Sequence, residues 1–260
     1  MPFRPIESEK LSVAVVRQIE DLILRGILRP GERLPAERDL AERLKVSRPI
    51  LRDAIAVLQA SGLVTAKPGA GIFIADVLGS AFSPALIQLF GRHEDAVYDY
   101  ISFRRDMEGL AAERAARYAT TADLEVVQAV FDKMEAAQTK RNPANDADLD
   151  AAFHSAIIEA SHNVVMLHMM RSMYELLREG VFYNRQVMFR QRTTRQLLLD
   201  QHRAINAALQ RRDGSAARQA VEAHLDYIEA CLRTDAKAAA HEKVAQQRLD
   251  QVRTIRTPPT

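Results

Sequence analysis

The two-residue connection Val46-Ser47 constrains the fold of the first part of the chain more than any other feature. The segments on either side of it, residues 35–45 and RPILRDAIAVLQASG, both carry apolar residues at helical spacing. Ser47 is a favourable N-cap for the second of them, and a further helical pattern over residues 12–25 precedes both. Two helices joined so tightly predict a helix-turn-helix.

A β-hairpin is predicted directly after these helices. Leu63–Lys67 and Ile72–Ala75 have the composition of short strands, and Pro68-Gly69-Ala70-Gly71 between them is a turn sequence. Residues 1–75 are therefore predicted to be a winged helix-turn-helix domain. This segment holds 12 Lys/Arg against 9 Asp/Glu, a basic excess that by itself favours a nucleic-acid partner only weakly.

The third helix of a winged helix-turn-helix enters the major groove with its N-terminal residues leading. This places Ser47, Arg48 and Arg52 where they would meet DNA, with Arg38 on the preceding helix as a further candidate. A guanidinium can bind guanine through two hydrogen bonds or hold a phosphate, and spacing does not decide which arginine does which. The alternative is that all three arginines are ordinary solvated surface residues.

The remainder of the chain is predicted to be almost entirely helical. Residues 76–95 form a linker with one short helix in ALIQLF, residues 96–234 a helical domain, and residues 235–260 a tail that is a frayed helix extension with a disordered end. Within the helical domain the predicted helices are 96–118, 121–139, 145–160, 163–181, 193–211 and 214–234. The predicted fold class is mainly α, a winged domain followed by an all-α bundle.

Three histidines and an aspartate on apolar helical stripes are candidate metal ligands. Asp150 and His154 stand one turn apart on one helical face, and His202 and His224 lie on the inward stripes of two later helices. Buried imidazoles need polar partners, and a carboxylate opposite them could share one cation with all three. Such mixed nitrogen and oxygen donors suit zinc first, with nickel, manganese or iron(II) as alternatives. The competing interpretation is a set of hydrogen-bonded core histidines.

Arg104 lies on a mostly apolar stripe of the helix predicted over residues 96–118. An unpaired guanidinium there would be costly, and a small carboxylic acid bound beside the metal would supply the missing anion. By spacing, an internal salt bridge to Glu108, four residues on, is the stronger alternative.

Composition excludes several other classes of protein. No run approaches the roughly 20 apolar residues of a membrane span, and the N-terminus lacks the apolar core of a secretory signal. Cys231 is the only cysteine, which excludes an internal disulfide framework and cysteine-based zinc clusters. The sequence thus predicts a cytoplasmic protein without a membrane partner.

The run LILRGILRPGERLPAERDLAERLKVSRPILRDAIAVLQASGLVTAKPGAGIFI resembles the winged-helix domain of the GntR family of bacterial transcription regulators. The resemblance implies that Arg38, Arg48 and Arg52 contact operator bases or phosphates, and that Ser47 anchors the DNA backbone. It also implies that Gly69 in the wing approaches the minor groove. Proteins of this kind usually read a short palindrome in double-stranded DNA as dimers, so a homodimer is expected.

The stretches YDYISFRRDMEGLAAERAA, DLDAAFHSAIIEASHN and DQHRAINAALQRRDGSAARQAVEAHL resemble the FCD ligand-binding domain of the FadR subfamily of GntR regulators. This resemblance implies a metal held by Asp150, His154, His202 and His224, with Arg104 gripping the carboxylate of an effector. A closer resemblance to the pyruvate dehydrogenase complex repressors within this family implies pyruvate, lactate or a similar acid.

Together these observations predict a transcriptional regulator rather than an enzyme. It is expected to be a repressor whose operator affinity a small carboxylic acid lowers. Two alternatives stay open. The metal could activate water in a hydrolase, with Glu108 or Glu159 as the general base, or it could be purely structural in a DNA-binding protein that senses nothing.

Overall fold

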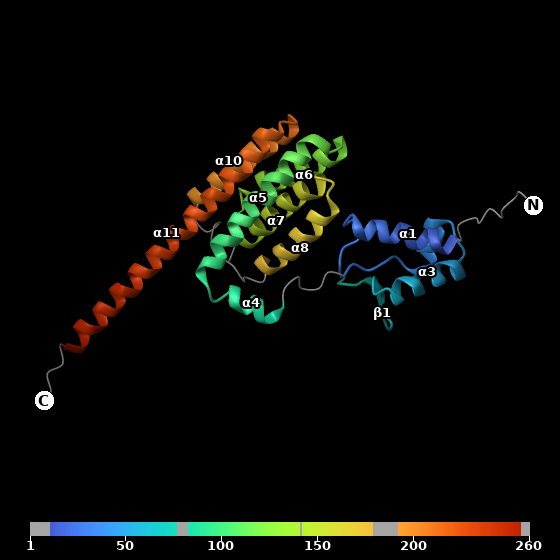
Figure 1. Ribbon diagram of the computed structural model, residues 1–260, viewed down its shortest axis with the longest axis horizontal. Helices are drawn as coiled ribbons and strands as arrows, with labels where there is room; N and C mark the ends of the chain where they lie inside the picture. Colours follow the sequence, from blue (N-terminus) through green and yellow to red (C-terminus); the bar gives the residue numbers. More distant parts are fainter. Residues whose placement is uncertain (1–10, 77–82, 141, 179–191, 256–260) are drawn as a thin grey trace, which may run out of the picture. The chain divides into compact units, whose positions relative to one another are not determined.

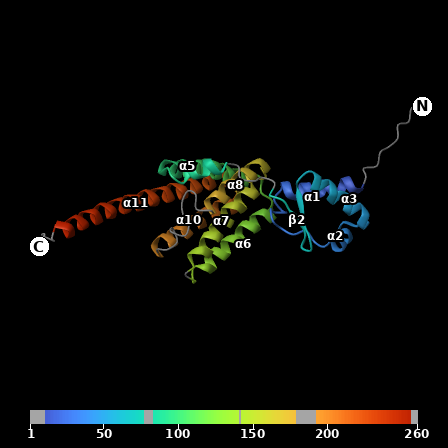
Figure 2. The ribbon, with the colours of Figure 1, turned by 90° about the horizontal axis from the view of Figure 1, so that it is seen from below.

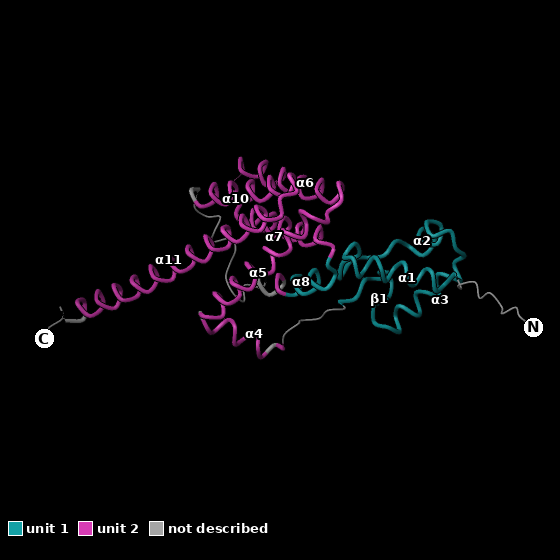
Figure 3. The backbone as a smooth tube through the Cα atoms, turned by 45° about the horizontal axis from the view of Figure 1, so that its top comes forward, with its two compact units in different colours: residues 1–82, 163–172 teal, residues 83–162, 173–260 magenta. Residues whose placement is uncertain are grey.

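The computed structural model describes residues 11–76, 83–140, 142–178 and 192–255. The chain divides into two compact units, one from residues 1–82 and 163–172 and the other from residues 83–162 and 173–260 (Figure 3). Helices make up most of both units, and the only described strands form one two-stranded sheet. The prediction of a mainly α protein is therefore confirmed.

The first unit contains the predicted helix-turn-helix and its hairpin (Figure 1). Its elements are α1 (Leu11–Leu24), α2 (Glu37–Leu44), α3 (Arg48–Ala60), β1 (Val64–Lys67) and β2 (Gly71–Ile74). Apolar residues from all five elements form one buried cluster, which includes Ile19, Ala41, Leu51 and Val64.

The turn between α2 and α3 sets the residue at which α3 begins. Lys45 ends α2 in the left-handed conformation, with φ of 54°, and its amide closes onto the last turn of the helix. Ser47 then stands at the N-cap of α3, although its side chain makes no capping hydrogen bond. Because Leu51 and Leu58 are buried on the inner face, Arg48 at the start of α3 is left exposed.

The two strands form an antiparallel hairpin in which Val64 pairs with Ile74 and Lys67 with Gly71. Val64 and Ile74 are buried and join the hairpin to the helical core. Gly69 in the connecting turn has φ of +71°, a conformation that glycine adopts without strain. The hairpin is thus anchored at its base and exposed at its tip, as the predicted wing requires.

The second unit is a bundle of helices lying side by side, with α11 packed along α5 and α10 (Figures 1 and 2). The helices assigned to it in whole or in part are α4 (Pro84–Phe90), α5 (Glu94–Tyr118), α6 (Thr121–Ala137), α7 (Pro143–Ala160), α8 (Val164–Arg178), α10 (Arg192–Gln210) and α11 (Gly214–Ile255). Residues 179–181, predicted as the end of a helix, lie outside the described residues.

Side-chain caps mark the starts of α6, α7 and α11. Thr120 and Asp123 form a reciprocal capping box at the start of α6. The Asn142 side chain accepts a hydrogen bond from the Asn145 amide at the start of α7, and Asp213 does the same for the Ala216 amide at the start of α11. These are the polar residues that punctuate the helical pattern in the sequence.

The C-terminal helix continues farther than the sequence pattern indicates. α11 runs unbroken to Ile255, so the segment expected to be a frayed extension is regular helix as far as it is described. Residues 233–253 are exposed throughout, and the end of α11 projects beyond the other bundle helices (Figure 2). Within the described ranges, no helix combines the length and apolar character that a membrane crossing requires.

Candidate metal centre and DNA-contacting residues

Four side chains predicted as metal ligands meet inside the bundle. Asp150 and His154 come from α7, His202 from α10 and His224 from α11. One potential ligand atom from each residue lies within 4.8 Å of all the others, and all four residues are buried. Three separate helices therefore converge on one point that is closed to bulk water.

The imidazole Nε2 atoms of His154 and His202 face a carboxylate oxygen. His202 Nε2 lies 3.1 Å and His154 Nε2 lies 3.6 Å from Asp150 Oδ1, and the two Nε2 atoms are 3.4 Å apart. The ring of His224 lies next to both other rings, with centroid distances of 5.2 Å to His154 and 4.5 Å to His202. The nitrogen lone pairs and the carboxylate are thus within reach of one cation.

Two further side chains contact the Nδ1 atoms of His154 and His224. His154 Nδ1 lies 2.7 Å from Glu108 Oε2 on α5, and His224 Nδ1 donates to Gln201 Oε1 at 2.8 Å. A hydrogen bond at Nδ1 fixes the tautomer that leaves Nε2 free to act as a ligand. Gln201 was not predicted from the sequence, because its spacing on α10 does not reveal that it faces His224 of α11.

Burial and neighbouring charges set the protonation of the cluster. Burial lowers the pKa of His202, although hydrogen bonding to Asp150 opposes this. Burial, together with the neighbouring His202 and His154, holds the pKa of His224 well below its ordinary value. For His154 burial is again the largest single effect and lowers the pKa, but the carboxylates Glu108 and Asp150 outweigh it and raise the pKa overall. Neutral rings at His202 and His224 keep lone pairs available for a metal.

The residues fit a bound divalent cation. His224 Nε2 is buried and has no hydrogen-bond partner among the described residues, although a polar atom in such a position is costly without one. Three imidazole nitrogens and one carboxylate oxygen form a donor set that zinc and several other first-row divalent metals accept. A cation would satisfy His224 Nε2 and would offset the negative charge of Asp150.

Arg104 lies on α5 close to this cluster and is itself fully buried. Its Nε donates to Glu108 Oε1 at 2.6 Å, which is the internal salt bridge that spacing favoured. The guanidinium also lies 5.5 Å from the centroid of the Tyr174 ring, and its positive charge contributes to the lowered pKa of His224. Glu108 is therefore shared between Arg104 and the ligand candidate His154.

The carboxyl group of Glu108 carries a negative charge in this setting. Burial alone would raise its pKa, but the positive charge of Arg104 and the hydrogen-bonding partner His154 lower it well below the usual range. A carboxylate held this way is a poor general base, because it gives up two strong interactions when it takes a proton.

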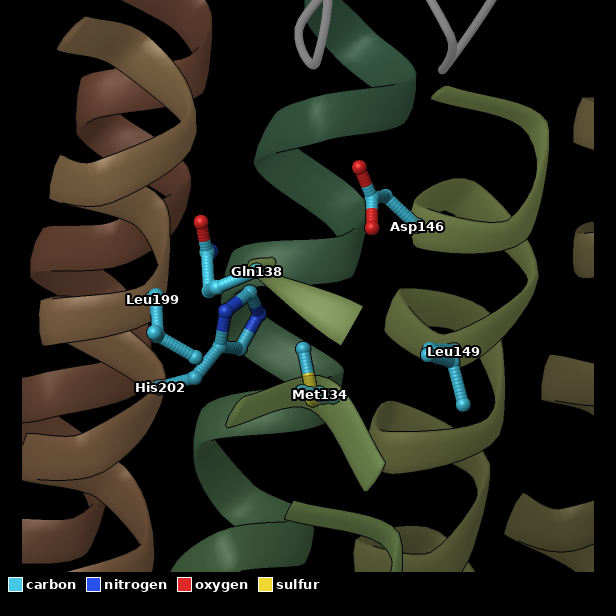
Figure 4. A pocket seen from close by; sticks show the side chains of 6 residues that line it. All are labelled: Met134, Gln138, Asp146, Leu149, Leu199 and His202. Carbon is cyan, nitrogen blue, oxygen red and sulfur yellow. The ribbon is translucent and has the colours of Figure 1, made fainter. Parts of the chain in front are cut away.

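A small pocket reaches His202 from between α6, α7 and α10 (Figure 4). Its lining residues are Met134, Gln138, Asp146, Leu149, Leu199 and His202. The pocket approaches the predicted metal ligand from the side of α10 that faces α6 and α7, and its walls are mostly apolar.

The arginines predicted to contact DNA are all exposed in the first unit. The Arg38 side chain is 84% exposed on α2, and Arg48 and Arg52 occupy successive turns at the start of α3. Arg52 Nε donates to Glu37 Oε2 at 2.9 Å, and Arg48 Nη2 lies 3.8 Å from the same oxygen. Glu37, which the sequence reasoning did not single out, holds these two guanidiniums side by side on one surface.

Comparison with known families gives two matches along the chain. Residues 11–74 match the family of bacterial regulatory proteins named gntR, and residues 99–227 match the FCD domain. The first match covers the winged helix-turn-helix. The second contains all four metal-ligand candidates together with Arg104 and Glu108.

Curated relatives align over most of their own length. The putative L-lactate dehydrogenase operon regulatory protein of Escherichia coli is 33% identical, over 91% of this chain and 92% of the relative. The Glc operon transcriptional activator of the same organism is 34% identical over 82% and 86%, and the transcriptional regulator LutR of Bacillus subtilis is 33% identical over 80% and 94%. These families and relatives are transcriptional regulators, not enzymes. The chain therefore belongs to the gntR family of bacterial regulatory proteins and is a DNA-binding transcriptional regulator with an FCD domain.

Proposed function

We propose that this regulator senses a small carboxylic acid, such as pyruvate or lactate, beside a divalent metal ion in its helical domain. The proposal rests above all on the buried convergence of Asp150, His154, His202 and His224. A site closed to water, with ligand atoms from three helices, suits a ligand-controlled switch better than a surface ion site does. Zinc is the first choice of metal, with nickel, manganese or iron(II) as alternatives.

In this proposal Asp150, His154, His202 and His224 hold the metal, and Glu108 and Gln201 fix the imidazole orientations. When bound, such a metal acts as a Lewis acid that attracts the oxygens of a small anion. Four protein ligands leave further positions for those oxygens if the ion is five- or six-coordinate.

Arg104 is proposed to bind the carboxylate of the effector. Its guanidinium is buried close to the ligand cluster, and a planar guanidinium matches a carboxylate through paired hydrogen bonds. Arg104 already pairs with Glu108, so a bound effector carboxylate would share the guanidinium with Glu108. The name of one relative refers to an L-lactate dehydrogenase operon, which supports a 2-hydroxy or 2-oxo acid as the effector.

The DNA-reading half is proposed to use Arg38, Arg48 and Arg52 on bases or phosphates, Ser47 on the DNA backbone and Gly69 near the minor groove. The exposed arginines at the start of α3, and a Ser47 hydroxyl that is not used in capping, support these roles. Two copies related by a two-fold axis would read a palindromic operator, so we propose a homodimer. We also propose a cytoplasmic location, because a regulator acts on DNA there.

The regulator is proposed to be a repressor that its effector releases from DNA. An effector changes DNA affinity only if it binds one arrangement of the chain better than another. A coupling of about 1–3 kcal/mol would change operator affinity roughly 5- to 150-fold.

The test measures operator binding by metal-loaded full-length protein, using a duplex selected from a random library. Addition of pyruvate or L-lactate should weaken binding 5- to 150-fold. Arg104→Lys keeps the positive charge but lacks the planar guanidinium that forms paired hydrogen bonds with a carboxylate. It should abolish this response while the metal stays bound. Arg105→Ala is the matched control, because Arg105 is its neighbour on α5 and forms a surface pair with Asp226.

Unchanged operator affinity across a panel of 2-oxo, 2-hydroxy and dicarboxylic acids would contradict acid control. A full response in Arg104→Lys would contradict the anion site while leaving the regulator itself in place. Tighter operator binding on adding acid would contradict repression relieved by the effector.

A further inference from the structure

We propose that Arg195 is a positioning residue of the metal centre, acting through Asp146 and the end of α6. This inference rests on the proposed function, because it concerns the geometry of the same four ligands. Arg195 lies on α10 and Asp146 on α7, so the pair links the two helices that carry His202 and the Asp150–His154 pair. Neither residue was singled out in the sequence.

Arg195 uses all three of its side-chain nitrogens. Nε donates to Asp146 Oδ2 at 2.6 Å, and Nη2 donates to Asp146 Oδ1 at 3.0 Å, which makes a two-pronged ion pair. Each of the two side chains is only 8% exposed. Two parallel hydrogen bonds in a buried pair fix the relative position of the two side chains more closely than a single exposed contact does.

The same guanidinium also holds the end of α6. Nη2 donates to Ala137 O at 2.7 Å and to Lys140 O at 2.8 Å, and Nη1 donates to Gln138 O at 2.9 Å. Carbonyl groups at a helix C-terminus lack partners within the helix, and a cation is favourable there. Arg195 thus ties α10 to both the end of α6 and the start of α7.

This link lies near the ligands on both helices. Asp146 precedes Asp150 by four residues, one turn of α7, and Arg195 precedes His202 by seven residues, two turns of α10. The two helices are therefore bridged twice, by Arg195 with Asp146 and by His202 with Asp150 at 3.1 Å. The first bridge sets the spacing at which the second pair meets a metal.

A small pocket lies between the two bridges. The pocket shown in Figure 4 is lined by Asp146, Gln138 and His202 together with apolar side chains from α6, α7 and α10. The polar link through Arg195 adds a constraint on the separation of α7 and α10 next to this pocket. Metal sites need it, since their ligands must be held to within about 0.5 Å.

The experiment measures the metal dissociation constant of the folded full-length chain by competition with a chromophoric chelator, using zinc and cobalt(II) as probes. Arg195→Lys keeps the charge but cannot form the paired contact with Asp146 and the three carbonyl contacts together. We expect about 10- to 100-fold weaker metal binding, as for other residues that orient metal ligands. The visible spectrum of the cobalt(II) protein should also change, because the ligand arrangement is altered.

Arg203→Ala is the matched control. Arg203 lies on the same helix in an exposed pair with Glu135, and its loss should leave both the dissociation constant and the spectrum as in the wild type. Asp146→Asn is the second variant if Arg195→Lys does not fold, and it should weaken metal binding in the same direction.

The outcomes separate this inference from the proposed function. Absence of metal uptake by wild-type protein would overturn the proposed function, and with it this inference. Normal uptake by the wild type, with an unchanged dissociation constant and cobalt(II) spectrum in folded Arg195→Lys or Asp146→Asn, would overturn this inference alone. A lower melting temperature without a change in metal affinity would assign Arg195 a structural role only, and would also overturn it.

Discussion

The winged domain and the helical domain each contain an arginine–glutamate pair, but in opposite surroundings. Arg52 and Glu37 are 2.9 Å apart with 61% and 35% of their side chains exposed, whereas Arg104 and Glu108 are 2.6 Å apart and 1% and 2% exposed. Water competes with the first pair and not with the second. An exposed arginine can therefore exchange its carboxylate for a DNA phosphate or base, while a buried one keeps a fixed geometry.

Because the two pairs differ in exposure, arginine and glutamate have different roles in the two domains. In the winged domain the charged side chains are exposed, and we propose that their arginines contact DNA. In the helical domain Glu108 accepts from Arg104 and contacts His154, so a charge network fixes the orientation of a ligand candidate. If exposure decides these roles, substitutions in the two domains should differ in kind and in size.

The largest expected effect is on stability, from removing the carboxylate of each pair. Glu108→Ala leaves Arg104 buried without its ion-pair partner and should lower the free energy of unfolding by about 3–5 kcal/mol. Glu37→Ala removes only an exposed partner and should cost about 0–1 kcal/mol. Urea unfolding at 25 °C with a chelator in every sample gives both values without a contribution from metal. Equal costs for the two substitutions would show that burial does not distinguish the pairs.

A somewhat smaller effect is expected on DNA binding. Arg52→Ala should weaken binding to the selected operator by about 1–3 kcal/mol, the usual value of a specific guanidinium contact, while the melting temperature stays the same. Fluorescence anisotropy with a labelled duplex measures the affinity. Arg25→Ala is the control, because Arg25, directly after α1, is a similarly exposed arginine that pairs with Asp21. If the two variants bind DNA equally well, Arg52 is an ordinary surface arginine.

The smallest effect concerns Asp123, a partly buried carboxylate in the helical domain. Burial is the largest single effect and raises its pKa, but hydrogen bonds from Thr120 and the contact with His162 together outweigh burial and lower the pKa. A lowered folded-state pKa stabilises the fold above the ordinary carboxyl pKa of about 4, and this contribution is lost as the pH falls through the folded-state value.

Asp123→Ala should therefore cost about 1 kcal/mol near pH 7, the value of a helix cap, and progressively less below pH 4. Urea unfolding at a series of pH values measures the difference from wild type. Asp132→Ala, at an exposed position of the same helix, is the control substitution. A difference that grows on acidification would mean that the sign of the pKa shift is wrong.

The sequence predicted those parts of the molecule that depend on spacing along one helix. Asp150 and His154 share a face because they are four residues apart, and the same rule gave the Arg104–Glu108 salt bridge. The tight connection at Val46-Ser47 likewise predicted the helix-turn-helix.

Contacts between helices could not be predicted in this way. Periodicity says which face of a helix points inward, but not which side chain of another helix it meets. Gln201 behind His224, Glu37 beside Arg48 and Arg195 on Asp146 are all of this kind. The helix extension after residue 234 was predicted, but not its regularity as far as Ile255, because a charged, alanine-rich segment without a packing partner has the pattern of a frayed helix.

The central claim is that Asp150, His154, His202 and His224 hold one divalent metal ion. Its most direct test is the metal content of untagged wild-type protein purified without chelators, measured by elemental mass spectrometry beside His202→Ala and the exposed-histidine control His241→Ala. The account predicts about one ion per chain in the wild type and in His241→Ala, and almost none in His202→Ala. Folded wild-type protein that stays metal-free in the presence of zinc, nickel, manganese and iron(II), or a His202→Ala variant that keeps its ion, would contradict it.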